Sequence, residues 1–373
     1  MKKSAREKEK KYDDKAINMD WTPANSEREA FIDEHKRLEK DNGPNGKNYN
    51  KFSWKKNIVN LIKEKMAIIR KDAFCFFDES THLENTLTLI VDNRYDLIEK
   101  YIIVNKITSI SINLNFTLCL EYGISKDNLL KVFPDETFFV RISSLIKYLY
   151  IGDFKLSNIK GIQSLQNLKT LSIGYCENNK TSGDIDIDFS KFPKLKHLYI
   201  PWFSKGFELT CNKELESLII YGFAPKSKNF TSLKLPQSLK CLELVRANIV
   251  NFDGLEMPLG EKIESYYCRN IESLKGIDNV AKTLKRVMIE NSKKLLDYEA
   301  ISKCTKLESI VFSKCGDIPS LSLISSLTQV RHFVILGTNV IDGNISQLLN
   351  IEKVAITNKP HYNYKYNGKW IKK

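Results

Sequence analysis

Residues that could catalyse a reaction or hold a metal ion are scattered along this 373-residue chain. None of the five histidines lies in an H-E-x-x-H pattern or another ligand spacing, and they fall far apart, at His35, His82, His197, His332 and His361. No Walker-type glycine loop and no G-x-S-x-G motif is present. The sequence therefore predicts no active site, no cofactor and no metal, and we expect a protein that is not an enzyme.

Two smaller groupings could still do chemistry. Asp184, Asp186 and Asp188 alternate with isoleucine, but no glycine-bearing calcium loop surrounds them, so a solvated strand is favoured over a cation site. Cys304 and Cys315 could meet across neighbouring turns. None of the eight cysteines forms a C-x-x-C pair, however, which favours reduced, mostly buried thiols in a cytoplasmic protein over disulfides.

Residues suited to recognition are better placed than residues suited to catalysis. Tyrosine, tryptophan and arginine anchor protein interfaces because they bury a large area at modest cost in entropy. The chain has 16 tyrosines and 4 tryptophans, and many of them fall at fixed distances from a repeated apolar pattern. That pattern defines the elements that must hold them in place.

The repeated pattern is a triplet of mostly apolar residues at positions 1, 4 and 6. Ten copies follow one another, and their first positions are 20 to 27 residues apart. Positions 4 and 6 would alternate along a short strand and point into the core, while position 1 would pack where the strand begins. The triplets are Ile146/Leu149/Ile151, Leu168/Leu171/Ile173, Leu195/Leu198/Ile200, Leu215/Leu218/Ile220, Leu239/Leu242/Leu244, Ile263/Tyr266/Cys268, Leu284/Val287/Ile289, Leu307/Ile310/Phe312, Val330/Phe333/Ile335 and Ile351/Val354/Ile356.

This spacing resembles the leucine-rich repeat family, with its pattern L-x-x-L-x-L-x-x-N/C-x-L, over residues 145–358. The best match runs from Leu168 to Cys176. At position 9 the family uses Asn or Cys to satisfy backbone groups, but several copies have an apolar residue there, as at Phe203, Phe223, Ala247 and Ile271. We therefore expect a largely degenerate ladder at position 9 and an irregular solenoid.

The segments between triplets carry a second apolar series at three-residue spacing, as at Ile318, Leu321, Ile324 and Leu327. That spacing predicts short helical or 3₁₀ turns. With the resemblance it implies an α/β fold: a leucine-rich-repeat solenoid with a curved parallel sheet, a short helical or irregular convex side, and an N-terminal α/β cap. Each coil would bury its apolar edge only by stacking on its neighbours.

Side chains at positions 3, 5 and 7 would project from the concave face of that sheet. In this register Tyr199 and Tyr267 occupy position 5, Arg286 position 3 and Arg269 position 7. Aromatic residues crowd the first half of the face and basic residues the middle. The alternative is that these side chains only pack against each other across strands. We predict that the concave face binds a partner through Tyr148, Tyr150, Tyr175, Tyr199, Trp202, Tyr221, Arg246, Tyr267, Arg269, Arg286 and Lys314.

The segments on either side of the repeats differ from them. Helices are expected from Ser26 to Lys40, from Trp54 to Ile69 and from Ser125 to Val132. Leu87 to Val91 and Tyr101 to Val104 are expected to be strands or buried segments. We divide the chain into a mobile charged tail (1–22), a helical region (23–74), a mixed α/β cap (75–144), the repeats (145–358) and an aromatic cap with one final strand (359–373).

The chain carries a net charge of +13, from 58 lysines and arginines against 45 acids. Residues 1–70 hold 18 of these cations and 12 of the acids, a net of +6. This excess permits attraction to an acidic protein, nucleic acid or anionic lipid. No run of about 18 apolar residues occurs, and no signal-peptide pattern begins the chain. We therefore expect a cytoplasmic protein without a membrane span.

These observations favour a non-enzymatic protein that uses its concave face to recognise another protein with an acidic surface. Intracellular repeats of this kind resemble bacterial immunity, adaptor and effector-type proteins, and the Ile-, Lys- and Asn-rich composition is typical of an AT-rich bacterial genome. The alternative is nucleic-acid binding by the basic N-terminal region, which includes Lys2, Lys3 and Arg6. Interleaved acids at Glu7 and Glu9 count against that alternative.

Overall fold

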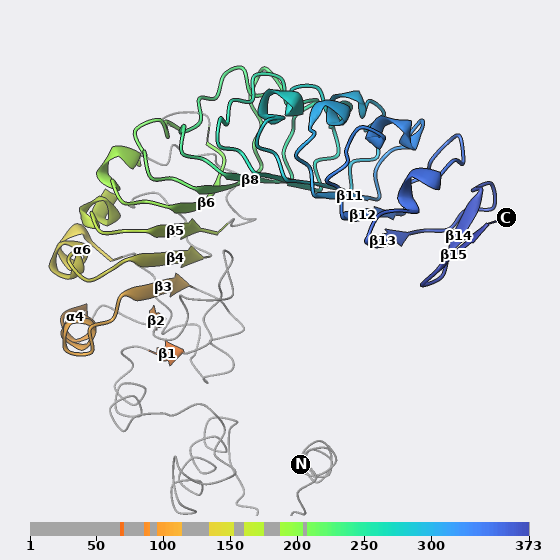
Figure 1. Ribbon diagram of the computed structural model, residues 1–373. Helices are drawn as coiled ribbons and strands as arrows, with labels where there is room; N and C mark the ends of the chain where they lie inside the picture. Colours follow the sequence, from red (N-terminus) through yellow and green to blue (C-terminus); the bar gives the residue numbers. More distant parts are fainter. Residues whose placement is uncertain are drawn as a thin grey trace, which may run out of the picture.

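The chain forms a curved solenoid with its strands along the inner side of the arc and its turns along the outer side (Figure 1). The computed structural model describes residues 68–70, 86–89, 95–113, 134–152, 160–174, 187–203 and 207–372. In these ranges, twelve strands from β2 to β13 pair in sequence order, each parallel to the next. This curved parallel sheet is the architecture that the repeated triplets predicted.

The parallel strands are short and closely similar in length. They are β2 (Thr86–Leu89), β3 (Ser109–Asn113), β4 (Tyr148–Gly152), β5 (Thr170–Ile173), β6 (His197–Pro201), β7 (Ser217–Tyr221), β8 (Cys241–Val245), β9 (Lys262–Tyr266), β10 (Arg286–Glu290), β11 (Ser309–Ser313), β12 (His332–Leu336) and β13 (Lys353–Ile356).

Strand register sends positions 4 and 6 of each coil into the core. Leu149 and Ile151 of β4 stand beside Leu171 and Ile173 of β5, and none of the four is more than 2% exposed. Leu168, at position 1, is fully buried where β5 begins. Nine of the ten predicted triplets occupy their predicted positions, so the apolar spacing alone located nine of the twelve parallel strands.

The predicted triplet Ile263/Tyr266/Cys268 is wrong. Ile263 on β9 pairs with Leu242 of β8 and Val287 of β10, both of which are position 4 of their coils. Ile263 is therefore position 4 rather than position 1, and every residue of this coil moves by three positions. Tyr266 becomes position 7, at the end of the strand.

Gly260 and Ser265 explain why the triplet was hidden in this coil. Gly260 takes position 1, and a Cβ added to it would lie 2.9 Å from the Met257 Cβ. The Met257 side chain, only 1% exposed, fills space near the start of the strand. Ser265 takes position 6 and is fully buried. Two of the three signature positions thus carry residues that no apolar pattern detects.

Position 9 forms a polar ladder in the second half of the array. With the corrected register Cys268 is position 9, and its thiol accepts a hydrogen bond from the Ala247 N–H at 3.2 Å. Ser292 Oγ donates to the Cys268 carbonyl at 3.0 Å, and Thr338 Oγ1 accepts from the Cys315 N–H at 2.8 Å. The expectation of a largely degenerate ladder is wrong for these four coils.

In the coils before this ladder, phenylalanines fill the same part of the core. Phe203 and Phe223 occupy position 9 and are at most 3% exposed. Phe189 stacks on Phe203 with ring centroids 6.3 Å apart, and Phe223 lies 5.1 Å from Phe230. Apolar packing therefore replaces the polar ladder in this half of the solenoid.

Short 3₁₀ helices form on the convex side, as the three-residue spacing predicted. In η7 (Leu321–Ile324) the residues Leu321 and Ile324 are 1% and 5% exposed and face the core. The others are η3 (Lys160–Ser164), η4 (Phe189–Lys191), η5 (Ile277–Val280), η6 (Glu299–Lys303) and η8 (Ser346–Leu348).

The N-terminal α/β region has longer helices. Helices α4 (Tyr95–Val104) and α6 (Glu136–Ile142) pack on the outer side near β3 and β4 (Figure 1), and β2 and β3 continue the repeat sheet in register. Tyr101 to Val104 thus belongs to a helix rather than a strand. Strand β1 (Ile68–Arg70), antiparallel to β2, includes Ile69, the expected end of a helix. The expected tail and the helices at Ser26 to Lys40 and Ser125 to Val132 lie outside the described residues.

The C-terminal segment forms a hairpin, not the single final strand expected from its alternating aromatics. Strand β14 (Tyr364–Tyr366) pairs antiparallel with β15 (Trp370–Lys372). Before it, Tyr362 is 1% exposed and its hydroxyl accepts a hydrogen bond from the Val340 N–H at 3.0 Å. Tyr362 thereby joins this segment to the last coils of the core.

Candidate protein-binding face

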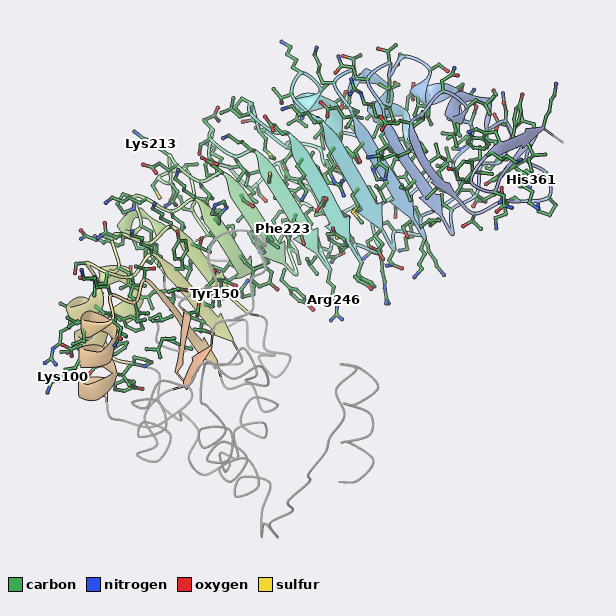
Figure 2. The ribbon with its side chains drawn as sticks, turned by 60° about the horizontal axis from the view of Figure 1, so that its bottom comes forward. Lys100, Tyr150, Lys213, Phe223, Arg246 and His361 are labelled. Atoms are coloured by element: carbon green, nitrogen blue, oxygen red, sulfur yellow. The ribbon has the colours of Figure 1, made fainter. Side chains whose placement is uncertain are left out.

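We call the side chains at positions 3, 5 and 7, which project from the concave face of the sheet, the concave floor. In the first half of the array this floor is aromatic. Tyr148 and Tyr150 lie on β4, Tyr199 on β6 and Tyr221 on β7, alternating with core residues. Tyr150, labelled on the sheet in Figure 2, is 6% exposed, and the other three are half-buried. Burial raises the pKa of the Tyr148 and Tyr199 hydroxyls. The structure brings these four predicted residues onto one face, whereas Tyr175 lies outside the described residues.

Trp202 follows β6 and belongs to an aromatic cluster. Its ring lies 4.8 Å from the ring of Phe207 and 4.7 Å from that of Phe223, edge to face with the latter. The side chain is half-buried and packs against the core. Trp202 therefore packs as part of the core, and a role in partner binding would use only its exposed part.

Glu264 lies at the centre of the concave floor, and the sequence interpretation missed it because of the misplaced triplet. Its side chain is 4% exposed, and its carboxylate accepts from Arg286 Nε at 2.8 Å and from Tyr266 Oη at 3.1 Å. Lys262 Nζ lies 3.0 Å from the same carboxylate. Glu264, rather than Tyr267, occupies position 5. The positive charge of Arg286 is therefore compensated within the protein.

Glu243 lies beside Glu264, directly opposite it on β8. It is half-buried, and within the described part of the chain its carboxylate makes no hydrogen bond or ion pair. Burial raises the pKa of Glu243, and the charge of Glu264 raises it further, while Lys262 acts in the opposite direction. Of these two neighbouring carboxylates, Glu264 is held by three side chains, whereas Glu243 makes no hydrogen bond or ion pair within the described residues.

Basic side chains collect where β8 to β11 end. We call positions 8 to 11 of these four coils the trailing rim; they contain five cations and one acid, Asp317. All five cations are exposed, and Arg246 reaches outward at this edge in Figure 2. The five are Arg246, Arg269, Lys293, Lys294 and Lys314. In the described ranges, the four that follow Arg246 in this series form no ion pair.

The backbone of the trailing rim is left-handed at position 8. The φ angles lie between +52° and +58° at Arg246, Tyr267, Asn291 and Lys314. Each of these N–H groups donates to the carbonyl at position 7 of the following strand, at 2.6 to 3.0 Å. Neighbouring coils have Gly222 and Gly337 at this position, where glycine meets the same geometry without strain. A bulky residue costs about 1–2 kcal/mol at such a position, which points to a use for its side chain.

Tyr267 and Arg269 belong to the trailing rim rather than to the floor. The prediction placed them at positions 5 and 7, but they are positions 8 and 10 in the observed register. Both side chains are exposed, and 48% of Tyr267 is accessible to solvent. The structure thus places Tyr267 and Arg269 beside Arg246 and Lys314 at one rim of the concave face.

On the opposite rim, charged side chains of neighbouring coils form ion pairs with one another. We call position 2 of each coil, just before the strand, the leading rim; from Lys196 onward its residues alternate in sign. Glu216 lies 3.9 Å from Lys196 and 3.5 Å from Lys240, and Lys285 lies 3.1 Å from Glu261. The alternating residues are Lys196, Glu216, Lys240, Glu261, Lys285, Glu308, Arg331 and Glu352. Neighbouring coils therefore compensate one another's charge along this rim.

The residues that could carry chemistry are not gathered. His332 Nδ1 lies 2.9 Å from Ser309 Oγ, and His361 Nε2 lies 2.9 Å from the Val340 carbonyl, in different coils. Asp188 caps η4 by accepting from Ser190, and the other two acids of its run lie outside the described residues. No group of three or more His, Cys, Asp or Glu in the described ranges could hold a metal ion. Nor does any helix in those ranges have the length and apolarity to cross a bilayer.

Cys304 and Cys315 are both buried free thiols, as the cysteine spacing favoured. Burial raises the pKa of each to about 12. Cys268 is likewise buried, while Cys241 is half-buried and Cys211 exposed. The remaining three cysteines lie outside the described residues.

Known proteins with a similar arrangement share little sequence with this chain. An internalin of Listeria monocytogenes is 15% identical, over 59% of this chain and 77% of the internalin, with a TM-score of 0.34. A leucine-rich-repeat protein of Leptospira interrogans is 14% identical, over 66% of this chain and 88% of that protein, with a TM-score of 0.23. No family model and no curated protein matches the sequence. The repeats and the twelve in-register parallel strands give this chain the leucine-rich-repeat solenoid fold.

Proposed function

We propose that this protein binds another protein on its concave face and carries out no catalysis. The trailing rim carries this proposal, because its exposed cations Arg269, Lys293 and Lys314 form no ion pair in the described chain and lie at or just after a left-handed backbone position. Curved solenoids offer an extended concave surface for such binding. Aromatic side chains on the floor supply the residue types that anchor protein interfaces.

The partner presents an acidic surface to the trailing rim. Four adjacent strands are about 4.8 Å apart, so the rim can contact an acidic segment about 15 Å long. Arg269 and Lys314 are among its cations, and their charges are not neutralised within the described chain. Glu243 on the adjoining floor disfavours nucleic acid there, because its carboxylate would repel phosphates.

We propose more specifically that the protein has an immunity, adaptor or effector-type role in a bacterial cytoplasm. The buried free thiols support a reducing compartment, and the Ile-, Lys- and Asn-rich composition supports a bacterial source. All three roles need one recognition surface and no active site.

Charge reversal at the two rims tests the proposal. Arg269→Glu with Lys314→Glu changes the trailing rim, and Lys240→Glu with Lys285→Glu makes the same change in charge on the leading rim. Immobilised wild type and both variants would be exposed to lysate of the source cells after nuclease treatment. Recovered proteins would be quantified by mass spectrometry and their affinities measured with purified protein.

The expected result is a protein retained by the wild type and the leading-rim variant, with affinity at least tenfold weaker for the trailing-rim variant. Binding should also weaken with added salt, because exposed charges are screened. Equal losses in both variants would contradict the proposal. So would retention that disappears on nuclease treatment, which would show nucleic-acid binding instead.

A further inference from the structure

Glu243 departs from the other residues at its level of the concave floor. Position 5 is apolar in several neighbouring coils, as at Ile219, Met288, Val311 and Val334. Glu264 is also charged, but two cations and a tyrosine hydroxyl satisfy it. Glu243 has no hydrogen bond or ion pair in the described part of the chain. A half-buried carboxylate without partners costs stability that an apolar residue would not.

Tyrosines lie on both strands that flank Glu243. Tyr266 is at the end of β9, and Tyr221 is at the end of β7, where the Arg246 guanidinium lies 5.7 Å from the centroid of its ring. Tyr199 lies at the same level of the sheet as Glu243, with Ile219 of β7 between them. Burial raises the pKa of Tyr199 and of Tyr266, and neighbouring negative charges that include Glu243 raise each further. An anion among aromatic faces is suited to a guanidinium or ammonium group, which gains both an ion pair and cation–π contact.

We propose that Glu243, with Tyr199 and Tyr266, receives one arginine or lysine side chain of the partner protein. This inference rests on the proposed function, since it specifies how the concave face holds that partner. The floor then binds a positive side chain of the partner, while the trailing rim binds negative side chains of the same partner. A partner is selected by two charges of opposite sign rather than by attraction to the net positive charge of the chain.

Met288 provides a reporter beside the site. The chain has five methionines, and Met288 lies opposite Glu264 on β10, with its sulfur 3.4 Å from Tyr266 Oη. Met257 is 1% exposed in the core and serves as the internal reference. Methyl-¹³C methionine labelling of the full chain therefore allows binding at the floor to be followed by NMR.

The test is a titration with Nα-acetyl-arginine methylamide and Nα-acetyl-lysine methylamide. The citrulline counterpart is the neutral control, since it keeps the shape of arginine without its charge. We expect a saturable shift of Met288 with the cationic compounds, none with citrulline, and no change at Met257. Glu243→Gln should weaken binding at least fivefold, whereas Glu216→Gln on the leading rim should leave it unchanged.

Two results would overturn the inference: an equal Met288 shift with citrulline, or undiminished binding by Glu243→Gln. An unchanged Met257 signal shows that each variant is folded, so loss of binding cannot be confused with unfolding. The titration contains no partner protein, so its outcome is independent of the rim-reversal experiment. If a recovered partner depends on the trailing rim but binds Glu243→Gln as tightly as wild type, only this inference fails.

Discussion

The two rims of the sheet lie at opposite ends of the same strands and differ in whether their charged side chains form ion pairs. On the leading rim, Glu216 contacts Lys196 and Lys240, and Glu261 contacts Lys285. On the trailing rim, Arg269 and Lys314 find no acid in the described chain. Charges compensated between coils help the coils stack, whereas uncompensated charges on a strained backbone contribute little to the fold. Charge pairing, rather than the number of charges, separates structural residues from candidate binding residues.

The largest effect is expected in the labelling rates of buried thiols beneath the trailing rim and of an exposed thiol elsewhere. Cys268 and Cys315 lie beneath the trailing rim at position 9 and are buried, while Cys211 is exposed in the loop before β7. Maleimide should label Cys211 at pH 7.5 about a thousandfold faster than Cys268 or Cys315, since burial limits access and reduces the thiolate fraction. Peptide mass mapping over time measures each rate, with buried Cys304 as the control. Labelling of Cys268 as fast as Cys211 would show that the trailing rim opens readily.

The next effect compares a buried carboxylate with an exposed one. Glu264→Gln leaves Lys262 and Arg286 without their acid and should lower the free energy of unfolding by about 2 kcal/mol, less than for a fully buried pair because both cations are partly exposed. Glu216→Gln on the leading rim should cost no more than about 0.5 kcal/mol, because exposed ion pairs are weak. Urea denaturation at pH 7 measures both. An equal loss of unfolding free energy in the two variants would contradict this difference between the floor and the leading rim.

The sequence predicted the solenoid because its core positions are periodic. Leucine or isoleucine at positions 4 and 6 marks a strand wherever both are present, as at Leu149 and Ile151. The aromatic residues Tyr148, Tyr150, Tyr199 and Tyr221 followed directly, because they alternate with those core residues. The short convex turns followed from apolar spacing as well.

The middle of the face could not be predicted because Gly260 and Ser265 break the apolar pattern. Tyr266 and Cys268 offered a better apolar match three residues later, and the shift concealed Glu264. Cys268 was also the signal that could have corrected it, since aligning it with Cys315 at position 9 restores the register. The ion pair between Arg286 and Glu264 could not be predicted either, because it joins residues 22 positions apart and depends on the register of β9.

Position 8 of the trailing rim should separate stability from binding. Lys314→Gly relieves a left-handed backbone and should raise the free energy of unfolding by up to about 1 kcal/mol, while weakening partner binding. Ser313→Gly, one residue earlier in β11, should instead lower the free energy of unfolding by about 1 kcal/mol. Urea denaturation and partner affinity are measured for both. A loss of stability in Lys314→Gly would mean that the side chain holds the coil together, as leading-rim residues do.

The smallest expected effect is the pH dependence that Glu243 contributes. Because its pKa is raised in the folded state, the protonated carboxyl favours folding below the ordinary pKa of glutamate, and that contribution is lost as pH rises through the raised pKa. Glu243→Gln should therefore be more stable than wild type by about 0.5 kcal/mol at pH 7, a value discounted for partial exposure, and equal to it at pH 4. Urea midpoints at both pH values measure the difference, with Glu216→Gln as the exposed control. A less stable Glu243→Gln at pH 7 would show that this carboxylate already has a partner in the folded chain and is not held open for one.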